Sequence, residues 1–278
     1  MVSKFAIRSG NVTLVEELLG RGCDIEETIG QLQTTPLQWA IWHNSLDMTK
    51  SLDMTRLLLS KGARQDHIKL RGWNTVFFCW NRLRHGEPSM LEFLNLLADD
   101  AYLDLDVLDA RDWTVLDRVA AVGTSEEAVR LIELGADPYQ ESLPLRWNAI
   151  HHAVFDGNYD TFKSLLPYYA DSTSMVDDPG WTLLHVAASA GQGAICRHLL
   201  ELGADPCALS EPYNSHMPEV LMNRRCTPCE AAASQSEERE QSFRSLVDTI
   251  CLSQGHVIVD QDGLTSSDVE FVDACEYL

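Results

Sequence analysis

The chain has 278 residues, of which 45% are hydrophobic and 23% are charged, and its formal net charge is −21. This composition favours a globular protein over a disordered one, and the charge argues against binding to nucleic acid or to anionic membranes, whose phosphates repel an acidic surface. No apolar stretch reaches the ~18 residues of a membrane span, and the polar beginning of the chain lacks the apolar region of a signal peptide.

A short motif that opens with Trp or Thr and continues into apolar residues recurs along the chain. Each copy is followed by apolar residues at i, i+3 and i+4 spacing, as at Val129 and Ile132, which predicts a second helix. That helix closes repeatedly on Gly-Ala, because glycine readily takes the left-handed conformation that ends a helix. The copies of the motif lie at 35–40, 73–79, 112–120, 147–153, 180–188 and 227–232.

These residues resemble the ankyrin repeat, whose motif is roughly Gly-x-Thr-Pro-Leu-His-x-Ala-Ala followed by Leu-Leu-x-x-Gly-Ala-Asp. Trp113, Trp147 and Trp181 are spaced 34 residues apart, close to the family period of 33. The resemblance implies an all-α solenoid of about seven helix-turn-helix units with β-hairpin finger loops over residues 1–252, the first unit truncated at Ser3. The overall look is similar to the divergent ankyrin proteins of filamentous fungi.

One hexapeptide is written twice in residues 45–56, as Ser-Leu-Asp-Met-Thr-Lys and Ser-Leu-Asp-Met-Thr-Arg. Six residues turn a helix through about 600°, so the two copies cannot present the same face. The second copy runs on into Leu57 and keeps Met54 in register with it. We therefore expect six extra residues near 45–50, lying between the two helices of the second unit. A tolerated duplication explains them most simply, because loop closure costs little entropy; a gained docking loop is the alternative.

Two connections and the tail depart from the repeat. Residues 99–112 and 209–225 are long, which predicts enlarged fingers, and the first of them carries an acidic cluster that either steers a basic segment or keeps the finger soluble. Residues 253–278 break the pattern, and we expect them to cap the last unit or to form a flexible acidic tail. The acidic cluster consists of Asp99, Asp100, Asp104, Asp106, Asp109 and Asp112.

Candidate metal and catalytic motifs are weak. Cys226 and Cys229 have the spacing of a zinc or redox pair, but zinc needs four ligands, and Cys229 stands where the repeat buries a leucine; buried structural thiols are the expectation. His151 and His185 occupy the same repeat position, where the family's histidine makes hydrogen bonds within and between repeats. No nucleotide-binding or nucleophile-elbow motif is present, and no cofactor is expected.

Four tryptophans fall at one repeat position, immediately before the first helix of their units. In ankyrin proteins this position faces the concave groove where partners bind, and Trp and Arg are both enriched in binding hot spots. A ladder of indoles that shields neighbouring repeats, with no guest, is the alternative. The candidate partner-binding residues are Trp73, Trp113, Trp147, Trp181, the upstream Arg71, Arg111 and Arg146, and His152, which we expect to face away from the core.

The resemblance implies a non-enzymatic scaffold or adaptor that holds a protein or peptide partner, and the net charge favours a basic partner. The competing interpretation is a small-molecule-binding protein or enzyme, with an aromatic-lined pocket in the groove and a buried carboxylate of perturbed pKa. Eight cysteines without an export signal favour reduced thiols and a cytoplasmic or nuclear location.

Overall fold

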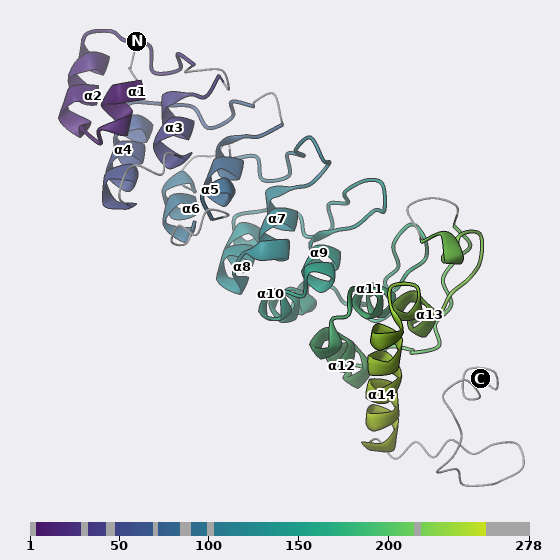
Figure 1. The fold of residues 1–278 in the computed structure, drawn as a ribbon. Coiled ribbons are helices and arrows are strands. Elements are labelled where there is room, and N and C mark those ends of the chain that lie inside the picture. Colours follow the sequence, from purple (N-terminus) through teal and green to yellow (C-terminus); the bar gives the residue numbers. More distant parts are fainter. Residues whose placement is uncertain are drawn as a thin grey trace, which may run out of the picture. The chain divides into compact units, whose positions relative to one another are not determined.

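The computed structural model describes residues 4–28, 33–42, 48–68, 72–83, 90–98, 103–213 and 218–253, which form seven consecutive helix pairs (Figure 1). The chain divides into two compact units, residues 1–143 and 144–278. The described residues include an isolated antiparallel bridge between Val176 and Thr182. The all-helical fold is confirmed, and the finger residues that the structure describes form turns and isolated bridges rather than regular strands.

The first unit contains four helix pairs. The first helices of successive pairs pack on one another, α1 on α3, α3 on α5 and α5 on α7, and the second helices form a parallel series of contacts. Each first helix also packs on the second helix of its own pair. The helices are α1 (Lys4–Arg8), α2 (Val12–Gly20), α3 (Pro36–Trp42), α4 (Met48–Ser60), α5 (Thr75–Leu83), α6 (Leu91–Leu97), α7 (Val115–Val122) and α8 (Ser125–Glu133).

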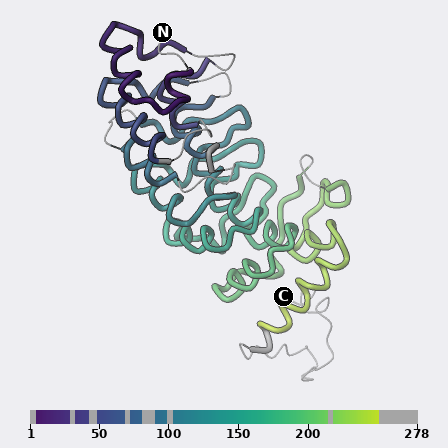
Figure 2. Tube along the Cα trace, turned by 60° about the vertical axis from the view of Figure 1, so that its left-hand side comes forward, coloured from purple at the N-terminus to yellow at the C-terminus, as the bar shows by residue number. Residues whose placement is uncertain are grey.

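The second unit repeats this two-layer packing over three pairs (Figure 2). Helix α11 packs between α9 and α13, and α12 packs between α10 and α14. The elements are α9 (Ala149–Asp156), α10 (Tyr159–Leu165), the 3₁₀ turn η1 (Leu166–Tyr168), α11 (Leu183–Ala190), α12 (Gly193–Glu201), the 3₁₀ turn η2 (Glu219–Leu221), α13 (Pro228–Ala233) and α14 (Glu237–Ser253). Pro167 lies in η1, where it ends α10.

The Gly-Ala pairs end the second helices as the sequence predicts. Gly62, Gly135 and Gly203 have φ values of 87°, 104° and 92°. The N–H of the following alanine donates to the carbonyl of the residue five positions earlier, as from Ala204 to Leu199 at 3.0 Å. This is the left-handed closure that glycine permits at low cost.

The core runs along the facing sides of the helix pairs. Phe77, Phe93 and Phe162 are its largest fully buried side chains; the first two belong to the two packed helices of one pair, α5 and α6, and the third belongs to α10 of the second unit. Because every pair contributes its own buried apolar set, stability is distributed along the repeats rather than concentrated at one centre.

The duplicated hexapeptide lengthens a helix. Helix α4 begins at Met48, so residues 48–50 form its first turn instead of a loop between the helices. Thr49 and Lys50 are exposed, whereas Met54 of the second copy is fully buried. An added turn costs little here because it extends an existing helix into solvent. The other inserted residues, 45–47, and the predicted cap or tail at 254–278 lie outside the described residues.

Candidate functional site

The predicted tryptophans differ in their surroundings. Trp73, Trp113 and Trp147 are partly exposed, and Trp181 is buried. In the first unit the ring of Trp73 stacks on Phe77 and meets the edges of Phe78 and Trp80, with centroids 5.7–6.0 Å apart. Its contacts are therefore with the chain's own aromatic side chains.

The other candidate residues are divided between surface and core. Arg111 and Arg146 are exposed, while Arg71 lies outside the described residues. His152 is only 2% exposed, and its ring meets Trp147 edge-on at 5.5 Å. The expectation that His152 faces away from the core is wrong, because its helix α9 is packed on both sides, by α10 and by α11.

Arg118 is a residue of this region that sequence reasoning missed. Its guanidinium carbon lies 4.2 Å from the centroid of Trp113 and 5.3 Å from that of Trp80. Its Nε donates to the carboxylate of Asp109 at 3.1 Å, and both side chains are largely buried. Arg118 lies within a helix of the repeat, so only its spacing from Trp113 could have suggested this contact.

Aspartates hold two of the tryptophan positions in place. Oδ1 of Asp177 accepts the backbone N–H of Trp181 at 2.8 Å, and its Oδ2 accepts the indole N–H of Trp147 at 2.9 Å. Asp177 is thus a bridge between two consecutive fingers of the second unit. Burial raises the pKa of its carboxyl to about 6, against the opposing effect of these two donors.

A cavity of about 370 Å³ opens at this bridge within the second unit. Buried Asp177, Pro179 and Trp181 contribute to its lining, together with the partly exposed Trp147 and with Phe155, which is 47% exposed. Pro218 and Gln235 contribute from the next finger and from the residues after α13, and Leu145 and Ser189 complete the lining. The cavity combines aromatic walls with one carboxylate, which is the composition of many binding pockets.

Known proteins share this architecture. Residues 116–210 match the family described as ankyrin repeats (three copies). Protein phosphatase 1 regulatory subunit 27 of Mus musculus is 35% identical over 108 residues, which cover 39% of this chain and 69% of that protein. The Homo sapiens protein of the same name is 44% identical over 63 residues, covering 23% of this chain and 40% of its own length.

This chain belongs to the ankyrin-repeat family. The crystal structure of the ankyrin repeat domain of Bcl-3, a member of the IkappaB family, superposes with a TM-score of 0.63 at 24% identity, covering 87% of this chain and 96% of that one. The two relatives named above are mammalian, so they give no support to a fungal type.

One position of the ankyrin motif caps the first helix in five repeats. Its side chain accepts the backbone N–H of the residue three positions earlier, as His185 Nδ1 does from Thr182 at 3.2 Å. Nε2 of His185 also bonds the carbonyl of Cys226 at 2.9 Å, which confirms the predicted role within and between repeats. Burial lowers the pKa of His185 to about 4 and raises that of Asp117 to about 7. The capping residues are Gln38, Asp117, His151, His185 and Glu230.

Cys226 and Cys229 are buried, free thiols, as predicted. Burial raises the pKa of the Cys229 thiol to about 11, so it stays protonated at neutral pH. Within the described ranges no group of three or more His, Cys, Asp or Glu is placed to hold a metal ion. None of the helices in that part of the chain combines the length and apolarity that a membrane span requires.

The acidic finger uses several of its carboxylates to hold its own backbone. Asp109 accepts the N–H groups of Arg111 and Trp113, and Asp106 accepts the N–H of Asp137 at 2.9 Å. Asp104 accepts the N–H of Asp106 at 3.1 Å. Asp99 and Asp100 lie outside the described residues. These bonds account for Asp104 and Asp109 as turn-forming residues and for Asp106 as a link to the next finger, while steering of a basic segment stays a prediction.

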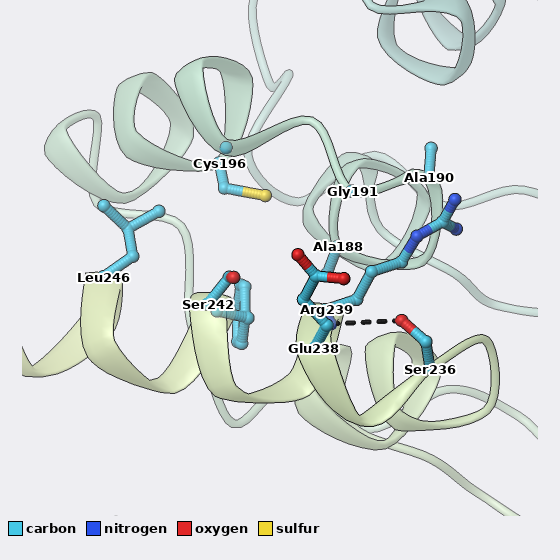
Figure 3. Close-up of a pocket in the computed structure, with 11 residues that line it drawn as sticks. Ala188, Ala190, Gly191, Cys196, Ser236, Glu238, Arg239, Ser242 and Leu246 are labelled. Atoms are coloured by element: carbon cyan, nitrogen blue, oxygen red, sulfur yellow. Dashed lines mark hydrogen bonds between the residues drawn. The ribbon is translucent and has the colours of Figure 1, made fainter.

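A second cavity, of about 490 Å³, lies between α14 and the helices α11 and α12 (Figure 3). Cys196 and Leu246 face it at one end, and Arg239 crosses it toward Ala190 and Gly191 at the other (Figure 3). The guanidinium of Arg239 donates to the backbone carbonyl of Ser189. Small side chains on α11 leave this space, and Arg239 partly fills it while holding the last repeat in place.

Replacing Trp147 with phenylalanine is expected to destabilise the second unit by about 1–2 kcal/mol, because it removes the donor to buried Asp177 while keeping an aromatic wall. Urea denaturation followed by circular dichroism measures the change. Tyr159→Phe is the matched control, since it removes a hydrogen bond of 3.0 Å to the imidazole of His198 rather than to a carboxylate. A smaller loss for Trp147→Phe than for Tyr159→Phe contradicts the structural role of this bridge.

Proposed function

We propose that this ankyrin-repeat chain is a non-enzymatic adaptor that binds a protein or peptide partner, with the cavity at Trp147, Phe155 and Trp181 as the principal contact of the second unit. The observation that carries the proposal is the exposure of Phe155 at 47% beside a partly exposed Trp147 and a cavity of about 370 Å³. Large aromatic side chains at the edge of a concave site are the usual anchors of protein interfaces.

The names of the two relatives suggest a first partner to test. Both are called regulatory subunits of protein phosphatase 1, and the mouse protein is matched over 69% of its length. We therefore infer that the partner is an enzyme whose activity the adaptor regulates, and the catalytic subunit of protein phosphatase 1 is the first candidate. A basic binding surface on the partner fits the net charge of −21.

Trp73, Trp113 and the exposed Arg111 and Arg146 belong to the proposal as secondary contacts. Trp73 and Trp113 are half-buried, and their rings contact Phe77 and Arg118 of the same chain. These internal contacts support a stabilising ladder in the first unit and a binding face in the second. A cytoplasmic or nuclear location is part of the same proposal and is tested with a fluorescent fusion.

Asp177 supports a second candidate function, the small-molecule site or enzyme, since it is a buried carboxyl in an aromatic-lined cavity with a pKa of about 6. Both of its oxygens already accept protein N–H groups, so proton transfer would break a structural bridge. Binding of a partner leaves these two hydrogen bonds of Asp177 intact, whereas proton transfer would break them, so we favour binding over catalysis at this cavity. A thermal-shift screen with small cationic molecules tests the second candidate.

Phe155→Ala tests the adaptor directly. Wild type, Phe155→Ala and the control Leu202→Ala are each used to capture partners from native lysate and to bind purified protein phosphatase 1 catalytic subunit. Leu202 is similarly exposed, at 50%, but does not line the cavity. We expect Phe155→Ala to weaken binding at least about tenfold and Leu202→Ala to leave it unchanged, with equal melting temperatures. Equal capture by all three variants contradicts the proposed binding face.

A further inference from the structure

Two fingers, one in each unit, form the same turn. Asp109 and Asp177 each stand four residues before a tryptophan and accept its backbone N–H, at 3.2 Å to Trp113 and 2.8 Å to Trp181. The aspartate N–H in turn donates to the tryptophan carbonyl, at 2.9 and 3.1 Å. The two carboxylates therefore have the same place relative to the indole that follows, and their surroundings can be compared directly.

In the first unit a guanidinium from the chain itself completes this turn. Arg118 stacks its guanidinium 4.2 Å from the Trp113 centroid and donates to Oδ2 of Asp109. The side chains of Arg118 and Asp109 are only 11% and 4% exposed. One cation thus satisfies the buried carboxylate and covers the indole face, a combination that the planar guanidinium provides through stacking and fork-shaped hydrogen bonds.

In the second unit the corresponding helix position carries Val186, which cannot supply a cation. Asp177 forms no ion pair with any Lys, Arg or His of the described residues, and its two donors are the uncharged N–H groups of Trp147 and Trp181. Its neighbour Asp178 adds negative charge and raises the pKa of Asp177 further. The turn is formed, but the charge that completes it in the first unit is missing.

An open cavity of about 370 Å³ lies against this uncompensated carboxylate. Trp147, Phe155 and Trp181 provide aromatic surface around Asp177, and Phe155 stands 5.3 Å from Trp147, centroid to centroid. The volume is several times the ~30 Å³ share of one water, so a side chain can enter it. Each carboxylate oxygen keeps a second acceptor position beyond the N–H that it already binds.

We propose that this cavity binds an arginine side chain of the protein partner, whose guanidinium takes the place that Arg118 fills in the first unit. The inference rests on the proposed adaptor function and specifies the chemistry of its partner. Arginine fits better than lysine because the guanidinium offers planar donors to Asp177 and a flat face to the indoles. A trimethylammonium group offers no donor to the carboxylate.

Short peptides test the assignment. The probes are an acetylated, amidated Gly-Ser-Arg-Ser-Gly pentapeptide and its counterparts with citrulline, lysine or trimethyllysine at the centre, titrated into the full chain. Binding is followed by the indole N–H resonances and by calorimetry. Citrulline keeps the shape of arginine without the charge, so we expect the arginine peptide to bind at least about tenfold more tightly than the citrulline peptide. Equal affinities, or tighter binding of trimethyllysine, overturn the proposal.

Three variants locate the site. Asp177→Asn and Phe155→Ala are expected to lower the affinity for the arginine peptide at least about tenfold. Asp178→Asn removes the same charge outside the cavity lining and is expected to lower the affinity by less than about twofold. In Asp177→Asn the amide N–H₂ of asparagine can point at the indole N–H of Trp147, which places two donors together and lowers the stability of the variant. If that variant unfolds, the affinity of Phe155→Ala, a change at an exposed position, tests the site. An unchanged affinity for Phe155→Ala, or an equal loss for Asp178→Asn, overturns the proposal.

The outcome separates this inference from the proposed function. If the peptides do not discriminate while Phe155→Ala still loses the captured partner, the adaptor stands and the arginine assignment fails. If the arginine peptide binds but capture is the same for all variants, the cavity is a guanidinium site that the adaptor interaction does not use.

Discussion

Arg118→Met is expected to destabilise the first unit by about 3–5 kcal/mol. The substitution keeps an unbranched apolar chain against the rings of Trp113 and Trp80 but leaves Asp109 buried without its cation. Breaking one partner of a buried ion pair costs this much because the remaining charge has lost both water and its counter-ion. Equilibrium urea denaturation of the full chain, followed by far-ultraviolet circular dichroism, measures the loss.

The double variant Asp109→Asn/Arg118→Met is the control for this experiment. The N–H groups of Arg111 and Trp113 both donate to Oδ1 of Asp109, and the amide oxygen of asparagine can accept them in the same way. The double variant should therefore recover at least half of the lost stability, since no unpaired charge remains. A loss below about 1 kcal/mol in the single variant would show that the pair behaves like an exposed ion pair.

His185→Ala is expected to destabilise the second unit by about 3 kcal/mol or more at pH 7.5. The imidazole is fully buried, and its removal leaves the N–H of Thr182 without its partner and takes from the carbonyl of Cys226 one of its two donors, the other being the N–H of Ser210 at 3.0 Å. Each buried unsatisfied group costs about 1–3 kcal/mol, and the cavity left by the ring adds to this. Thermal and urea unfolding at a series of pH values measure the effect.

The effect of His185→Ala should shrink on acidification. Burial holds the pKa of His185 at about 4 in the folded chain, against 6.5 in the unfolded chain. Between these values the unfolded chain binds the proton and the folded chain does not, so the stabilisation present above pH 6.5 is lost as the pH falls toward 4. The shift of the pKa from 6.5 to about 4 corresponds to about 3 kcal/mol in the free energy of unfolding. The free energies of unfolding of wild type and variant should therefore become similar near pH 4.

His151→Ala provides the matched comparison. His151 occupies the same repeat position and also caps its helix, but its buried Nε2 has no hydrogen-bond partner among the described residues. Its replacement breaks no hydrogen bond to the next finger, and we expect a loss about 1–2 kcal/mol smaller than that of His185→Ala at pH 7.5. Equal losses of stability for the two variants would show that the ring stabilises the fold through packing rather than through the hydrogen bond to Cys226.

The candidate site was partly predictable. The 34-residue spacing marks Trp147 and Trp181 as equivalent, and the structure places both at one cavity. The same spacing gave no reason to treat the first unit differently, yet there Arg118 covers Trp113. His152 was wrongly taken as outward-facing because a helix position gives direction only relative to its own axis, and α9 has packed neighbours on both sides.

The sequence by itself determined the family, the number of repeats and the ends of the second helices. These features follow from local rules, since Gly-Ala closure and apolar i, i+3, i+4 spacing act within a few residues of one another. It also determined the buried state of Cys229 and the capping role of His185, because the repeat register assigns each of them a fixed environment.

Only the tertiary structure decided which carboxylates are compensated. Asp109 and Asp177 both stand four residues before a tryptophan. They differ in the side chain that the following helix brings to the turn: Arg118 donates to Asp109, whereas Val186 at the equivalent position carries no charge. The desolvation of a carboxylate and the opening of a cavity depend on all the side chains that surround a point in space. Those side chains come from separate fingers and helices, so the difference between the two units appears only in the folded chain.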